Sequence, residues 1–132
     1  MQLPELVSCA KGVGTRRLVE AWQSWRKGRI VPLKSAMDLR DVRMFLPWLG
    51  LLELGDADIV RARLAGTALR DVFGIDMTGR NLKRITRQED WARRNAPSRS
   101  LFNQPCGSIF RCTKPLADGK MAPYETVALP LD

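Results

Sequence analysis

The sequence predicts an α+β fold, in which an antiparallel sheet carries helices packed on one face. Two pairs of extended segments each surround a turn, and alternation of their side chains is typical of β-hairpins. Helical periodicity precedes the first pair, and short helical pieces separate it from the second. Two hairpins with helices between them indicate this class. The extended segments are residues 48–54, 60–64, 108–113 and 124–131.

The composition fits one folded domain and excludes several kinds of catalyst. The chain has 132 residues, 45% of them hydrophobic and 27% charged, which suffices for a packed core. It carries 22 basic and 14 acidic residues, a net charge of +8, and this balance favours an anionic partner without specifying one. Histidine is absent. Triads that use imidazole, His-ligated zinc and His-ligated haem are therefore excluded.

The first helix is expected at residues 16–27, with Thr15 as its N-terminal cap and Gly28 in the left-handed conformation beyond its end. The two tryptophans on its apolar face lie three residues apart, and a single layer would not cover both rings. We therefore expect this helix to pack on a second copy of the chain as a homodimer. The apolar face, at helical spacing, comprises Leu18, Ala21, Trp22 and Trp25.

A second helix is expected at residues 38–47. The Asp38 carboxylate can accept the free backbone N–H groups at its start, and Pro47 is expected to end it. A hairpin follows, with a polar turn at residues 55–58. Its second strand should point apolar residues inward and arginines outward: Val60, Ala62 and Leu64 against Arg61 and Arg63.

The connection between the hairpins begins with a short helix, capped by Thr67 and closed by Gly74. A turn at residues 76–80 and short helical pieces over residues 81–104 come next. The dipeptide Asp118-Gly119 predicts the turn of the second hairpin. The buried side of the short helix is expected to hold Ala68, Leu69, Val72 and Phe73.

Three cysteines, Cys9, Cys106 and Cys112, show neither a disulfide framework nor zinc-ligand spacing, so we expect reduced thiols that fill the core. The N-terminus lacks the pattern of a secretory signal, and no apolar run approaches the ~18 residues of a membrane span. We expect a cytoplasmic protein with no membrane partner.

The middle of the chain resembles a bacterial PAS-type sensor domain, in a proteobacterial branch of that family. The resemblance is carried by Arg63-Leu64-Ala65-Gly66-Thr67-Ala68-Leu69, Phe73-Gly74 and Asp76-Met77-Thr78-Gly79-Arg80-Asn81-Leu82. The lead-in of the same branch is matched upstream by Trp25-Arg26, Gly28, Pro32, Asp38 and Leu46-Pro47.

This resemblance implies a five-stranded antiparallel sheet, with helices over one face enclosing a small pocket or a plugged core, and an N-terminal helix often used for dimerisation. Four strands are visible, and the fifth would follow Leu131, whereas the sequence stops at Asp132. The expected organisation is a flexible lead-in at 1–15, a helical segment at 16–47 and a PAS core at 48–132 that lacks its last strand.

The resemblance also bears on cofactors. Haem-holding PAS domains usually use a histidine, and members that form a flavin adduct carry Asn-Cys-Arg on a helix. This chain has no histidine, and its Arg111-Cys112 lies in an expected strand. We therefore expect no cofactor.

The predicted function is a non-catalytic sensory module that binds a small apolar ligand or a protein partner. Tyr124 is the strongest candidate for ligand contact because it is the only tyrosine and a buried hydroxyl needs a partner. The alternative is that all candidates simply fill the core. The expected pocket residues are Leu64, Phe73, Trp91, Phe110, Cys112 and Tyr124.

Two other functions receive less support. The basic charge gathers in residues 11–34 and 80–99, which could follow a phosphate backbone, but no known nucleic-acid-binding motif accompanies it. Paired carboxylates at Asp38 and Asp41, and at Asp56 and Asp58, are typical of a helix start and a turn, so we expect no enzyme. The second basic cluster, around Trp91, comprises Arg80, Lys83, Arg84, Arg87, Arg93, Arg94 and Arg99.

Overall fold

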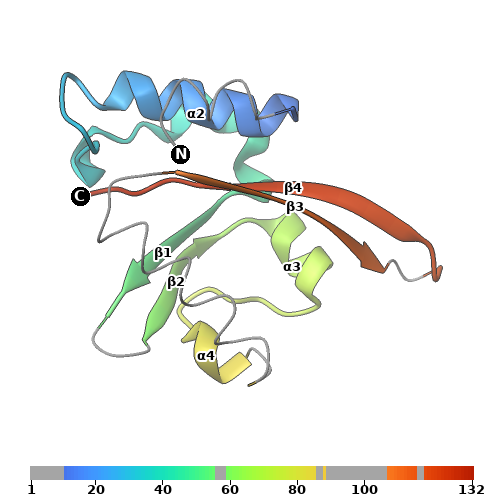
Figure 1. Cartoon of the computed structure of the whole chain (residues 1–132). Helices are drawn as coiled ribbons and strands as arrows, with labels where there is room; N and C mark the ends of the chain where they lie inside the picture. The colour runs from blue at the N-terminus through green and yellow to red at the C-terminus, as the bar shows by residue number, and fades with distance from the viewer. Residues whose placement is uncertain (1–10, 56–58, 86–87, 89–106, 116–117) are drawn as a thin grey trace. The chain divides into compact units, whose positions relative to one another are not determined.

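The chain divides into two compact units, Met1–Val42 with Leu101–Asp132, and Arg43–Ser100. Each unit combines short helices with an antiparallel β-hairpin (Figure 1), as the sequence predicts. The computed structural model describes residues 11–55, 59–85, 88, 107–115 and 118–132.

The first unit pairs one long helix with one long hairpin. Helix α2 (Val13–Trp25) contacts strand β4 (Met121–Ala128), and β4 pairs along its whole length with β3 (Ser108–Pro115). Figure 1 shows α2 in blue alongside this hairpin. The predicted turn is confirmed, because Gly119 has a φ of 81° and Asp118 accepts the Lys120 N–H at 2.9 Å. Strand β4 begins and ends three residues earlier than predicted.

Helix α2 also begins earlier than predicted. Its N-cap residue is Gly12, so the prediction of Thr15 as the cap is wrong, and Thr15 lies inside the first turn. The end is close to the prediction, because the helix stops at Trp25 and Gly28 takes a φ of 84°. The start differs because the cap comes from outside the local sequence, as described below.

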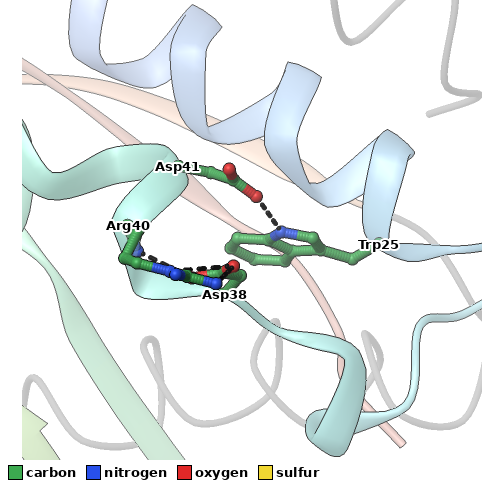
Figure 2. Close-up of polar contacts among 4 residues, drawn as sticks. All are labelled: Trp25, Asp38, Arg40 and Asp41. Carbon is green, nitrogen blue, oxygen red and sulfur yellow. Dashed lines mark hydrogen bonds and ion pairs between the residues drawn. The ribbon is translucent and has the colours of Figure 1, made fainter.

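The buried face of α2 holds both tryptophans. Trp22 is 3% exposed and donates its indole Nε1–H to the carbonyl of Pro130 at 2.7 Å. Trp25 is 5% exposed and donates to the Asp41 carboxylate at 2.8 Å (Figure 2). The same chain thus supplies the cover for both rings, so they do not require a second copy. Val19 is fully buried where the sequence favoured Leu18, which is half-buried.

The residues after β4 hold the connection that leaves α2. Asp132 donates its N–H to Pro32 and accepts the N–H of Lys34, both at 2.8 Å, in the pattern of a parallel β-bridge. An ion pair between Arg29 and Asp132 at 3.1 Å reinforces the pairing. The extended segment before the next helix is therefore paired with the residues at the other end of the sequence.

The second predicted helix is a 3₁₀-helix, not an α-helix. After a short turn at η1 (Lys34–Ala36), η2 (Leu39–Trp48) bends at Val42, whose φ and ψ are −124° and 22°. Asp38 accepts the Arg40 N–H at 3.0 Å, as predicted for the start. Pro47 does not end the helix but lies within its last turn, because the φ that its ring imposes is compatible with helical backbone.

The second unit contains the other hairpin. Strand β1 (Gly50–Leu54) pairs with β2 (Val60–Ala65), with a bulge between Leu51 and Leu52. There the register advances by one residue on β1 and by two on β2, from Leu64 to Ala62, so Arg63 is the extra residue, and it pairs with Glu53 at 2.6 Å. The predicted alternation of β2 is confirmed in that Val60 and Ala62 are buried and both arginines are exposed. Leu64 is half-buried.

Helices α3 (Thr67–Phe73) and α4 (Leu82–Ile85) follow β2, and α4 contacts that strand. Gly74 ends α3 with a φ of 74°, as predicted, but the N-cap is Gly66, and Thr67 is the first helical residue. The segment between the helices lies along β2, since Gly79 donates to Ala62 and Ala62 donates to Arg80. The turn at 56–58 and most of the helical pieces predicted after α4 fall outside the described residues.

The described strands form two separate two-stranded sheets. The mixed α and antiparallel β class is therefore confirmed. A single five-stranded sheet stays a prediction, as do the domain boundaries expected from the sequence.

The surroundings of Gly66 explain why the motif that carries the family resemblance has a glycine there. A Cβ at this position would overlap the backbone carbonyls of Leu46 and Pro47, at the end of η2. Gly66 also donates its N–H to Leu49 at 2.8 Å. Only a residue without a side chain lets the start of α3 approach η2 so closely.

We expect Gly66→Ala to lower the free energy of unfolding by on the order of 3 kcal/mol, because a methyl group would collide with backbone rather than a movable side chain. Gly50→Ala is the control, since its Cβ would make an ordinary contact of 3.5 Å with Leu69. Urea denaturation followed by circular dichroism measures both. Equal losses of stability in the two variants would contradict the explanation that the close backbone approach requires glycine at position 66.

We expect Trp22→Phe to lower the free energy of unfolding by at least about 2 kcal/mol, because it replaces a buried ring with a smaller one and leaves the buried Pro130 carbonyl without its donor. Trp48→Phe serves as the matched control, since Trp48 is 62% exposed. Thermal unfolding followed at a far-ultraviolet wavelength compares the two. A similar stability for both variants would contradict the assignment of Trp22 as an anchor.

Candidate functional site

A carboxylate from the hairpin meets the N-terminus of α2. Glu125 of β4 accepts the backbone N–H groups of Lys11 at 3.1 Å and Gly12 at 3.0 Å, and the hydroxyl of Thr15. Arg111, its cross-strand partner on β3, donates from Nε at 3.1 Å. The Glu125 side chain is 12% exposed. This cluster joins three segments that lie far apart in the sequence.

The environment of Glu125 strongly favours its charged form. Burial by itself would raise the pKa, but the hydrogen bonds from Thr15, Gly12 and Lys11 and the charge of Arg111 outweigh it. Together they lower the pKa from 4.5 to about 2. Glu125 therefore stays ionised at any physiological pH, and its negative charge lies at the positive end of the α2 dipole.

The N-terminus of α2 has no cap of its own. Gly12 has no side chain to accept a hydrogen bond, and the first turn contains no acidic residue. A Cβ at Gly12 would lie 3.0 Å from the Thr15 hydroxyl and 3.3 Å from a Glu125 oxygen. Glycine therefore leaves the space that the carboxylate occupies.

An open depression of about 690 Å³ adjoins this cluster. It brings the cationic side chains of Lys11 and Arg111 beside Pro123, where the hairpin surface is exposed. Its shape is that of a surface groove rather than an enclosed cavity. The lining consists of Lys11, Gly12, Arg111, Thr113, Pro123, Tyr124 and Glu125.

Three of the predicted pocket residues share the β3–β4 hairpin. Cys112 pairs directly with Tyr124 across the hairpin, and position 110 lies two residues away on the same side of the pleat. Tyr124 is 42% exposed. Leu64 on β2 and Phe73 on α3 belong to the other unit, and Trp91 lies outside the described residues. The hairpin thus accounts for three of the six, and the pocket itself stays a prediction.

Glu125 was not among the residues singled out from the sequence. A lone glutamate in an alternating strand is ordinarily a solvent-facing residue, so the local pattern gave no reason to select Glu125. The feature that could have indicated such a residue is in α2. Its N-terminus has a glycine as N-cap and no acidic residue in the first turn, so it needs an acceptor from elsewhere in the chain.

The aspartates near η2 have structural roles. Asp41 accepts from the Trp25 indole, while Asp38 holds the Arg40 guanidinium at 2.9 Å on the same turn (Figure 2). The hydrogen bond from Arg40 lowers the pKa of Asp38. Asp56 and Asp58, together with Cys9 and Cys106, lie outside the described residues.

The described residues contain neither a helix that could span a membrane nor a cluster that could hold a metal ion. None of their helices combines the length and apolar character needed to cross a bilayer. Their His, Cys, Asp and Glu side chains form no group of three or more that could hold a metal ion.

The architecture is that of a mixed α and antiparallel β module with an N-terminal helix. A family model described as PAS domain matches residues 10–132, nearly the whole chain and including α2. The chain belongs to the PAS domain family, whose members are generally non-catalytic sensory or regulatory modules. Neither a curated protein nor a solved structure matches it.

Glu125 should make stability depend on acid. Its pKa in the folded state is about 2 and thus below the ordinary value of 4.5, so its stabilising effect is complete above pH 4.5 and is lost as pH falls toward 2. We expect the wild type to lose about 2 kcal/mol more than Glu125→Gln between pH 5 and pH 3.

Urea unfolding monitored by tryptophan fluorescence at each pH measures this difference. Glu20→Gln is the control, since it removes an acidic group of the same helix from an exposed pair with Arg17 at 3.6 Å. Parallel pH curves for the wild type and Glu125→Gln would contradict the role assigned to the carboxylate.

Proposed function

We propose that this chain is a non-catalytic sensory module whose β3–β4 hairpin contacts a small apolar ligand on the side of the pleat that holds Tyr124. Membership in the PAS domain family is the observation that carries this proposal. The register adds support, because positions 110, 112 and 124 share one side while Glu125 and α2 occupy the other.

The exposure of Tyr124 suits a contact residue better than a core residue. A ring that is 42% exposed gains apolar contact when a ligand covers it. The homodimer through α2 belongs to this proposal as a further expectation.

Nucleic-acid binding has less support from the described residues. Arg17, Arg29 and Arg63 are paired with acidic side chains. Arg26 lies 5.8 Å from the centre of the Trp22 ring. In the second basic cluster, Arg80, Lys83 and Arg84 are exposed, but Arg87, Arg93, Arg94, Arg99 and Trp91 lie outside the described residues.

Fluorescence titration with the anionic dye 1-anilinonaphthalene-8-sulfonate, whose anilinonaphthalene part is apolar, tests the ligand contact. We expect saturable binding to the wild type, weakened about tenfold in Tyr124→Ala through loss of the aromatic contact. Met121→Ala is the matched control, because Met121 is 58% exposed on the same strand but on the opposite side of the pleat. Equal affinities in all three proteins, or no saturable binding, would contradict the proposal.

A further inference from the structure

We propose that Glu125 is a latch that couples the β3–β4 hairpin to the first turn of α2, so that a change on the Tyr124 side of β4 alters the order of that turn. The part that concerns a ligand rests on the proposed function. The latch itself rests on the contacts of Glu125 alone.

The first step is that the N-terminal cap of α2 is supplied by another element, strand β4. The backbone N–H groups at the start of a helix need acceptors, and here Glu125 supplies one for Gly12 and one for Lys11. Thr15, inside the first turn, also donates to the same carboxylate. A displacement of β4 by a fraction of a hydrogen-bond length would weaken all of these bonds together.

The second step is that the two ends of α2 are held independently. The C-terminal half is anchored by the buried Trp22 and Trp25, each hydrogen-bonded through its indole. The N-terminal turn has little apolar burial, since Val13 is 77% exposed. Loss of the Glu125 contacts can therefore release the first turn while the rest of the helix stays in place.

The third step is the alternation of β4. Tyr124 and Glu125 are consecutive residues, so their side chains lie on opposite sides of the pleat. Arg111 ties the carboxylate to β3, and the adjacent pair Cys112 and Tyr124 belongs to the same ladder. A contact that shifts Tyr124 must shift the neighbouring backbone from which Glu125 reaches α2.

Amide hydrogen exchange on the full chain tests the latch, with Glu125→Ala, Glu125→Gln and the control Glu20→Gln compared to the wild type. In Glu125→Ala we expect the amides of residues 11, 12, 16 and 17 to exchange about tenfold faster, because the first two donate to Glu125 and Arg16 donates to Gly12 in the turn that the carboxylate holds. Glu125→Gln should show a smaller increase, since it keeps an acceptor oxygen. Residues 19–25 should change less than about twofold. A uniform increase along α2, or no change, would overturn the latch.

A second arm repeats the measurement with the same anilinonaphthalene dye at saturation. A change in the exchange of the amides of residues 11, 12, 16 and 17 in the wild type that is absent from Glu125→Gln supports the coupling. If the dye binds at Tyr124 but leaves these amides unchanged, the coupling is overturned and the sensory proposal stands. If the dye does not bind saturably, the sensory proposal fails, and the variants alone decide the latch.

Discussion

The first unit depends on the burial of two indoles that must each find a hydrogen-bond acceptor. An indole N–H without an acceptor is costly in the interior, so the Pro130 carbonyl and the Asp41 carboxylate have to lie where α2 presents the rings. These two acceptors lie far apart in the sequence. The position of α2 therefore determines both where the chain runs after β4 and where η2 begins, and the pairing of Asp132 with residues 32–34 follows from it.

The sequence predicted those features that local chemistry determines. Glycines with positive φ at residues 28, 74 and 119, the Asp38 acceptor, and the alternation of β2 were all recognisable from the residues themselves. The wrong prediction at the start of α2 has another cause. Thr15 is a good cap by type, yet the cap of α2 comes from Glu125, which is 110 residues away. No periodicity within a segment contains information about such a partner.

The same distinction applies to the candidate site. Tyr124 could be identified by its chemistry and Cys112 by its strand, and the register places them opposite each other. Glu125 could be identified only once α2 and β4 were known to be neighbours. Gly66 is a similar case. Its φ is an ordinary −65°, so the need for glycine there comes only from the nearby carbonyls of Leu46 and Pro47.

If a helix supplied its own cap, movement of the adjacent strand would leave the hydrogen bonds of its first turn intact. In α2 those bonds end on β4, and β4 also presents Tyr124 to its other side. Since a strand has no side chain that belongs to both faces, the only connection between them is the backbone of adjacent residues. The arrangement therefore makes the order of a helix terminus depend on what happens across the sheet, which is a useful property for a sensory module.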